Sequence, residues 1–172
     1  MGNQRHSHNS LLLVPMKISL WSIGKAHEAY VKPGVDEFSS RLDRYFNTEW
    51  KIIAPPKVAA SMNEEQLKKA EAVIILNMLS KEDYLVILDE RGKMLDSIQL
   101  AEMIQGRGNE SVKNIVFLIG GAYGVDTTLM QRAQFKWSLS ALTFPHQLVR
   151  LILAEQLYRA CTILRNEKYH HR

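Results

Sequence analysis

Short apolar runs and helical patterns of apolar residues alternate along the chain. A run of about four to eight apolar residues bounded by turn residues is typical of a buried strand, whereas apolar positions three and four residues apart indicate one face of a helix. These patterns predict strands at residues 17–23, 50–54, 84–88, 115–119 and 137–140. They predict helices at residues 61–78, 97–105, 127–134 and 145–165, and along the face formed by Val31, Val35, Phe38, Leu42 and Tyr45.

Capping and helix-breaking residues locate several boundaries of these elements. Pro33-Gly34 interrupts the first helical face, which indicates a kink or a new helix start. Ser61 and Glu64 have the spacing of a capping box and are expected to open the second helix. Gly106 and Gly108 are expected to end the third helix, because glycine is the usual residue after a helix.

The alternation of strands and helices predicts an α/β fold with a mainly parallel sheet flanked by helices. Residues 89–92 are expected to turn the chain after the third strand. Met16 is followed directly by a strand, so a single domain is expected to span residues 16–172. Residues 1–15 are expected to be an N-terminal extension or a cloning remnant, since their apolar run is too short for a signal peptide.

Composition excludes several classes of protein. With 46% hydrophobic and 23% charged residues, the chain is an ordinary globular sequence. No apolar run approaches the roughly 20 residues of a membrane span, so no membrane association is expected. The one cysteine, Cys161, cannot form an internal disulfide, which fits a cytoplasmic protein. No Cys/His spacing typical of a zinc site occurs, and no metal is expected.

Positive charge gathers near the C-terminus. The net charge is +4, and the segment from Pro145 onward holds five arginine or lysine residues against two glutamates. A basic, histidine-containing tail suits a polyanion such as RNA. A solvated surface helix with a frayed end would show the same charge pattern, so charge alone does not decide between the two interpretations.

Three loops that follow predicted strands are candidates for a ligand site, because ligands of open α/β sheets bind beyond the carboxyl ends of the strands. These loops are residues 88–92, 120–124 and 139–145. The glycines of the second loop allow close approach of backbone to a ligand or positive φ angles. The loop lacks the G-x-G-x-x-G pattern and a P-loop lysine, and an ordinary glycine turn remains an alternative.

The third loop is apolar and nearly uncharged although it precedes the basic helix. Its backbone N–H and C=O groups could recognise the edge of an adenine, with Leu88 and Leu142 as apolar walls. A buried connection without a ligand is the alternative interpretation. Pro145 suits the first turn of the helix that follows.

Two polar groups near the C-terminus are further candidates. Glu155 and Arg159 are four residues apart on one helix face, where they form either a plain ion pair or a pair that faces substrate. The terminal residues Tyr169 to Arg172 are either disordered or supply a ring for stacking, an imidazole and a cation for phosphate.

Together these segments resemble the RlmH family, a group of SPOUT-class ribosomal RNA methyltransferases. The resemblance extends from Met16 to the end of the chain. It is carried by residues 119–121, 138–146, 148–150, 155–160 and 169–170. The stretch from Ser138 to Arg150 is its most specific part, whereas the double glycine alone would not identify the family.

The resemblance implies a homodimer with a trefoil knot in the C-terminal part of the sheet. It implies S-adenosylmethionine-dependent methylation of N3 of a pseudouridine in large-subunit (23S) ribosomal RNA, on the assembled ribosome. The implied cofactor-binding residues are Leu88, Gly120, Leu139, Ser140, Ala141, Leu142, Thr143 and Phe144. The residues implied to engage the target base are Glu155, Arg159, Tyr169 and His170, and we expect Arg150 and Arg172 to bind RNA.

The imide proton on N3 must be removed during such a reaction. His170 and Glu155 are both candidates for the base, and Arg150 and Arg159 are candidates to stabilise the developing negative charge. The sequence does not choose between them.

Other functions remain as alternatives. A SPOUT methyltransferase acting on another RNA, such as tRNA, would carry similar cofactor loops. A non-catalytic ribosome-binding protein could keep the fold, and cofactor binding would distinguish it from an enzyme. A nicotinamide-dependent oxidoreductase is disfavoured by the missing dinucleotide fingerprint.

Overall fold

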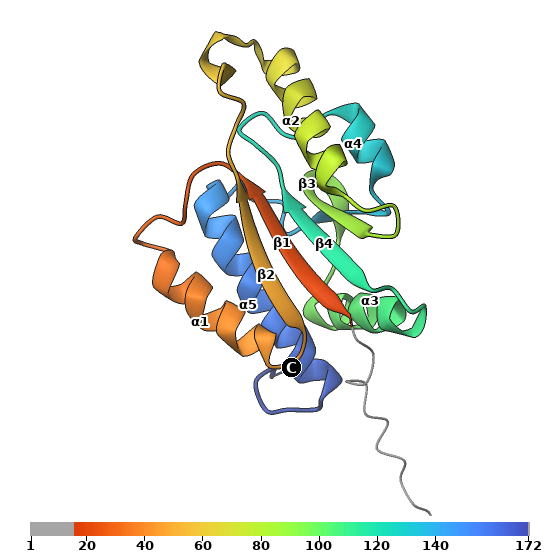
Figure 1. Ribbon diagram of the computed structural model, residues 1–172. Coiled ribbons are helices and arrows are strands. Elements are labelled where there is room, and N and C mark those ends of the chain that lie inside the picture. The colour runs from red at the N-terminus through yellow and green to blue at the C-terminus, as the bar shows by residue number, and fades with distance from the viewer. Residues whose placement is uncertain (1–15, 172) are drawn as a thin grey trace, which may run out of the picture.

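The computed structural model describes residues 16–171. In this part of the chain five strands form one sheet in the order β2-β1-β4-β3-β5, and every neighbouring pair is parallel (Figure 1). The strands are β1 (Lys17–Ile23), β2 (Asn47–Ile53), β3 (Tyr84–Met94), β4 (Asn114–Ile119) and β5 (Phe135–Ser138). The predicted α/β fold with a parallel sheet is therefore confirmed, and each of the five predicted strand segments overlaps one strand of the structure.

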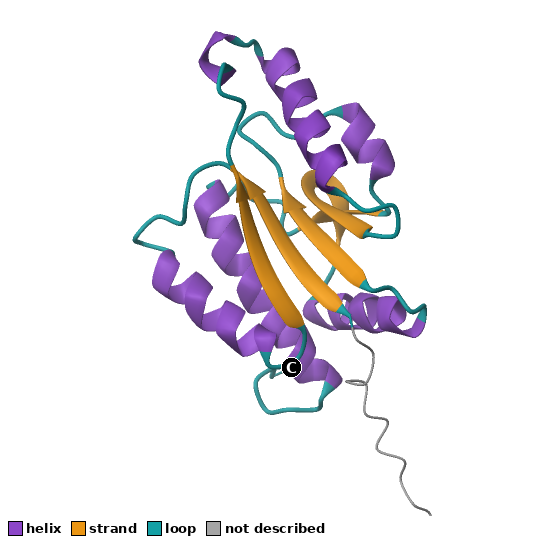
Figure 2. Ribbon diagram, viewed as in Figure 1, coloured by secondary structure: helices purple, strands orange, loops and turns teal. Residues whose placement is uncertain are grey.

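Helices cover both faces of this sheet (Figure 2). They are α1 (Lys32–Asp43), α2 (Glu64–Met78), α3 (Ser97–Asn109), α4 (Thr127–Arg132) and α5 (His146–Leu164), with a short 3₁₀ helix at Ala59–Ser61. Helices α1, α3 and α5 pack on one face, and α2 and α4 pack on the other. Within residues 16–171 no helix has the length and apolar character required to cross a membrane.

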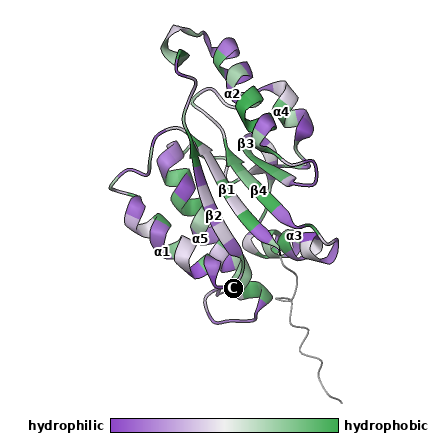
Figure 3. Cartoon of the chain, viewed as in Figure 1, coloured by the Kyte–Doolittle hydropathy of each residue, from purple (hydrophilic) through white to green (hydrophobic). Residues whose placement is uncertain are grey.

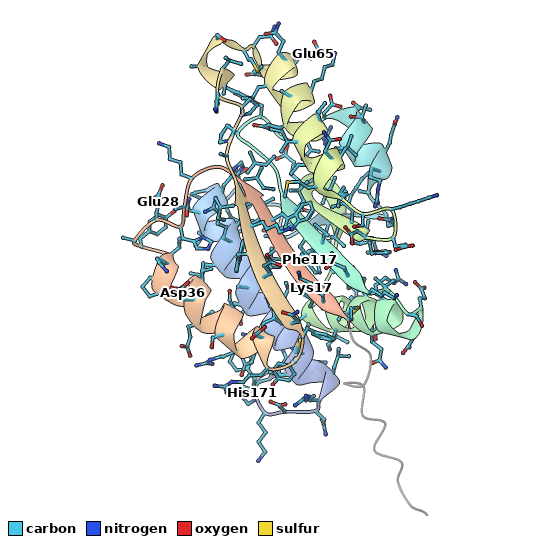
Figure 4. All side chains as sticks on the ribbon, viewed as in Figure 1. Lys17, Glu28, Asp36, Glu65, Phe117 and His171 are labelled. Carbon is cyan, nitrogen blue, oxygen red and sulfur yellow. The ribbon has the colours of Figure 1, made fainter. Side chains whose placement is uncertain are left out.

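The central strand β4 is apolar from Ile115 to Ile119 because both of its faces are buried. Ile115 and Phe117 point into the core beneath α3 and α5, whereas Val116 and Leu118 point into the core beneath α2 and α4. All four side chains are fully buried. Hydrophobic colour accordingly concentrates on β4, and Phe117 lies in the middle of the sheet (Figures 3 and 4).

Two of the predicted helix starts can be compared with the structure. Pro33 lies in the first turn of α1, so the alternative of a new helix start is confirmed and no kink forms. The predicted capping box at Ser61 and Glu64 is wrong. Asn63 caps α2 instead, in a reciprocal pair with Gln66, while the Ser61 hydroxyl donates to the carbonyl of Val58.

The predicted turn at residues 89–92 is also wrong. Strand β3 continues to Met94 with an irregularity between Leu88 and Lys93, and both of its parts pair with β5. Gly92 permits this pairing, because a Cβ atom there would lie 2.6 Å from the backbone carbonyl of Lys136. Residues 89–92 thus belong to the continuing strand, in which Glu90 and Arg91 are exposed and the Asp89 side chain is largely buried.

Helix α3 does not end at its glycines. It runs through Gly106 and Gly108 to Asn109, and the residue that follows with positive φ is Ser111. Apart from their chain neighbours and the backbone of the helix itself, no described atom lies within 4 Å of the Cβ position of either glycine, so both face open space. The prediction failed because the left-handed position was occupied by serine, which the glycine rule does not anticipate.

Candidate functional site

A cavity of about 880 Å³ opens at the carboxyl ends of β3, β4 and β5. Every predicted cofactor-binding residue except Ala141 lines it: Leu88, Gly120, Leu139, Ser140, Leu142, Thr143 and Phe144. The start of α5 closes one side through His146 and Val149. The three loops that the sequence identified separately therefore meet at one edge of the sheet, as expected for open α/β sheets.

The loop between β5 and α5 is organised by serine hydroxyls. The Ser138 hydroxyl donates to the carbonyl of Ser140 (3.0 Å), and the Ser140 hydroxyl accepts from the backbone N–H of Leu142 (3.0 Å). Among the described residues, the backbone N–H groups of Ala141, Thr143 and Phe144 have no hydrogen-bond partner. Leu142 is 71% exposed at the cavity. Free backbone donors beside an apolar wall fit the edge and face of a purine ring.

The glycine loop between β4 and α4 forms the opposite wall. Gly124 has a φ of 86° and its N–H donates to the carbonyl of Gly121, which closes the loop tightly. A Cβ atom on Gly120 would lie 2.6 Å from the side chain of Val125. Gly120 is therefore required for packing of the loop itself, and it also lines the cavity.

Both positively and negatively charged side chains lie at the rim of the cavity. Arg91 is paired with Asp89, with Nε 2.9 Å from Oδ1, and this hydrogen bond lowers the pKa of the aspartate. Lys68 of α2 and Tyr123 of the glycine loop also line the cavity. The sequence analysis missed this part of the wall, because no local pattern brings a residue of α2 next to a loop more than fifty positions away.

A buried carboxylate lies behind the glycine loop. Glu71 of α2 is 6% exposed, and burial raises the pKa of its carboxyl group. Its two carboxylate oxygens lie 2.7 Å from the position that a Cβ atom on Gly121 would take. The sequence analysis did not single out Glu71, since it is one of several acidic residues along α2.

The candidate residues near the C-terminus form a second cluster, centred on Glu155. The Glu155 carboxylate accepts from Arg159 Nε (3.0 Å), from the Tyr169 hydroxyl (3.1 Å) and from Gln156 Nε2 (2.7 Å). The Arg159 guanidinium also stacks over the Tyr169 ring, 4.6 Å from its centre. Burial, followed by the charge of Glu155, raises the pKa of Tyr169.

The described part of the tail is thus held against its own helix. Tyr169 packs against Tyr158 with ring centres 4.7 Å apart, and Glu167 accepts a hydrogen bond from the Tyr45 hydroxyl. Nδ1 of His170 is shielded from solvent and has no hydrogen-bond partner among the described residues. Arg172, predicted to bind RNA, lies outside the described residues.

The two groups of candidate residues are separated within one subunit. None of Glu155, Arg159, Tyr169 and His170 lines the cavity. Along the axis of α5, Arg159 lies about 15 Å beyond the cavity residue Val149, at about 1.5 Å per residue. The chain end near His171 lies at the end of α1 and α5 that is remote from the carboxyl ends of the strands (Figure 4).

Arg150 lies inside the protein, although the sequence analysis expected it to bind RNA. It is 1% exposed, and its guanidinium donates to the Ser22 hydroxyl (2.9 Å) and the Lys25 carbonyl (2.8 Å). Burial, then the charge of Arg150, lowers the pKa of His27, whose Nδ1 is 3.3 Å from the same guanidinium. These contacts join the loop after β1 to α5, and RNA binding by Arg150 stays an untested prediction.

A parallel sheet with helices on both faces and a loop-lined cavity at its carboxyl edge has the architecture in which α/β proteins bind ligands. A family model described as "Predicted SPOUT methyltransferase" matches residues 16–170. A ribosomal RNA large subunit methyltransferase H from Cytophaga hutchinsonii is 44% identical over 156 residues, which cover 91% of this chain and 100% of the relative. The protein of the same name from Flavobacterium johnsoniae is 44% identical over 91% of this chain, and the one from Acetivibrio thermocellus is 40% identical over 90% of this chain. Each match covers 99% of the relative. The chain therefore belongs to the SPOUT methyltransferase family.

Proposed function

We propose that the protein transfers the methyl group of S-adenosylmethionine to N3 of a pseudouridine in large-subunit (23S) ribosomal RNA. The observation that supports this most directly is the cavity formed by three strand-end loops in a chain of the SPOUT methyltransferase family. The names of the similar proteins from three bacteria supply the substrate class. The trefoil knot implied by the resemblance remains part of this proposal.

The cavity offers suitable groups for the cofactor. We propose that the free backbone N–H groups of the loop 139–145 bind the adenine, with Leu88 and Leu142 against its faces. The glycine loop at residues 120–124 would face the part of S-adenosylmethionine beyond the adenine. When bound, S-adenosylmethionine supplies a methyl carbon activated by its sulfonium; alignment and charge control come from the protein.

Contacts in the C-terminal cluster favour His170 over Glu155 as the base. The Glu155 carboxylate already accepts several hydrogen bonds, from the guanidinium, phenol and amide groups described above. Its proposed role is to position Arg159 and Tyr169. Nδ1 of His170 has no partner among residues 16–171 and is the group proposed to accept the N3 proton. Arg159 would then stabilise the negative charge that develops on the pseudouridine ring as N3 loses its proton.

A single subunit cannot combine these two groups of residues. Methyl transfer needs the reacting atoms about 3–3.5 Å apart, whereas the cluster lies well outside the cavity. We propose a homodimer in which the tail of one subunit serves the cavity of the other. Leu148, Ile152, Glu155 and Arg159 follow one another on a single, partly exposed stripe of α5. This stripe is the proposed interface, because it carries both apolar residues and the target cluster.

The substrate is proposed to be the ribosome in the cytoplasm, since the compact chain offers little surface for recognising free RNA. The test begins with calorimetry of S-adenosylmethionine and its demethylated product, S-adenosylhomocysteine. Single-turnover methylation of intact ribosomes, free ribosomal RNA and tRNA follows. Methyl transfer to ribosomes at a pseudouridine is the expected result. Methyl transfer to tRNA alone would show that tRNA, and not the ribosome, is the substrate. If neither S-adenosylmethionine nor S-adenosylhomocysteine binds, the proposal of a methyltransferase is refuted.

A further inference from the structure

The carboxylate of Glu71 is buried. The residue is 6% exposed, and among the described residues it makes neither a hydrogen bond nor an ion pair. Lys68, one turn earlier on α2, lines the cavity but is not within ion-pair distance of the Glu71 carboxylate. Burial of an unpaired carboxylate costs free energy, and burial raises the pKa of this group. Such a group gains stability when a cation arrives nearby.

The position of Glu71 relates it to the cavity through one residue. Gly121 lines the cavity and also contacts the carboxylate, whose oxygens lie 2.7 Å from its Cβ position. Any side chain at residue 121 would displace the carboxylate from this place. The glycine therefore allows a negative charge to approach the back of the loop, separated from the cavity by the thickness of one backbone segment.

We propose that Glu71 is a specificity-determining residue that favours the positively charged methyl donor over its neutral-sulfur product, acting across Gly121. The inference rests on the proposed function, because it assumes that the cavity binds S-adenosylmethionine. The donor carries a sulfonium, and S-adenosylhomocysteine carries an uncharged thioether in its place. The carboxylate thus stabilises the first ligand and leaves the second almost unaffected, which assists release of product.

The expected size of the effect follows from the geometry. A ligand atom seated on Gly121 would be roughly 7–8 Å from the carboxylate, the sum of two van der Waals contacts of about 3.5–4 Å. At an effective dielectric constant of about 20 to 40, Coulomb's law for two unit charges at that distance gives a preference of about 6- to 55-fold. Removing the charge should reduce the ratio of the two affinities by this factor.

The experiment measures the affinities of the full-length protein for S-adenosylmethionine and S-adenosylhomocysteine by calorimetry. The test variant is Glu71→Gln, which keeps the shape of the side chain and removes its charge. The matched control is Glu65→Gln on the same helix, because the Glu65 side chain is 74% exposed and forms an ion pair with Lys69. Glu71→Leu is a second test variant, should the glutamine variant fail to fold, since an apolar residue is well tolerated in place of a buried charge.

We expect Glu71→Gln or Glu71→Leu to weaken donor binding about 6- to 55-fold while product affinity changes little, and Glu65→Gln to leave the ratio unchanged. An equal loss for both ligands would show a structural role and overturn the inference, as would an unchanged ratio. If the wild-type protein binds neither ligand, the proposed function itself fails. Binding of both ligands with a ratio insensitive to residue 71 removes only the role of Glu71.

Discussion

Complementation between two inactive subunits tests whether the tail of one subunit serves the cavity of the other. The first variant is Gly120→Val, whose Cβ would collide with Val125 and disrupt the glycine loop. The second is His170→Ala, which removes the imidazole whose Nδ1 has no hydrogen-bond partner within residues 16–171. Each homodimer should be inactive. The Gly120→Val protein should not bind the cofactor, and the His170→Ala protein lacks the proposed proton acceptor.

The fraction of methylation activity that the mixture should recover follows from the twofold symmetry of the dimer. In a mixed dimer, one of the two composite sites combines an intact cavity with an intact tail, and the other site carries both defects. Random exchange of equal amounts makes about half of the dimers mixed, and each of these has half of its sites active. The mixture should therefore recover about a quarter of the wild-type methylation rate. If cavity and tail served the same subunit, every site would carry one defect and nothing would be recovered.

The assay is single-turnover methylation of ribosomes at saturating cofactor, after the variants have been unfolded and refolded together. Separately refolded variants that are mixed only at the start of the assay provide the control, because their subunits have not exchanged. Activity that stays at the level of the separate variants, in a sample shown to contain mixed dimers, would refute the arrangement in trans. A monomeric mass at micromolar concentration would refute the dimer.

Three further perturbations follow from the same contacts. Deleting residues 168–172 should abolish methyl transfer without changing calorimetric binding of S-adenosylhomocysteine, and equal transfer rates would show that the tail has no role. Arg150→Met should lower the free energy of unfolding in urea by about 1–3 kcal/mol, because it leaves buried acceptors unsatisfied, and Arg150→Lys should not restore it fully. A smaller change would show that these contacts contribute little. Because the folded pKa of Glu71 lies above its ordinary value of 4.5, the native state binds this proton more tightly than the unfolded state, so wild-type stability should fall as pH rises from about 4.5 through the folded pKa. Glu71→Leu should lose this decline in denaturation curves, and an unchanged pH profile would contradict the burial argument.

Much of the candidate site was predictable because its loops follow strands. The apolar run at 115–119 and the glycines after it are adjacent in sequence, and so are the strand at 135–138 and the apolar loop that follows it. Parallel strands in one sheet bring such loops to one edge, which explains why the predicted cofactor residues meet there. The wall supplied by α2 was not predictable, since nothing local relates Lys68 or Glu71 to the glycine loop.

The same distinction applies to single residues. The basic residue at position 150 was expected to bind RNA, and the sequence did not reveal that its guanidinium is buried and donates to Ser22 and Lys25. The polar segment 89–92 suggested a turn, but pairing with β5 keeps it in the strand. In both cases contacts with distant segments set the surroundings of the residue, and the residue type alone did not indicate them.

The sequence by itself determined the order of strands and helices and the segments able to bind a ligand, because these depend on hydrophobic spacing and on residues close together in the chain. Only the tertiary structure decided which segments meet. It separates the Glu155 cluster from the cavity, and it places Glu71 against the back of Gly121. The physical reason is that burial and pairing depend on atoms contributed by remote parts of the chain, so the charge of a side chain does not reveal its surroundings.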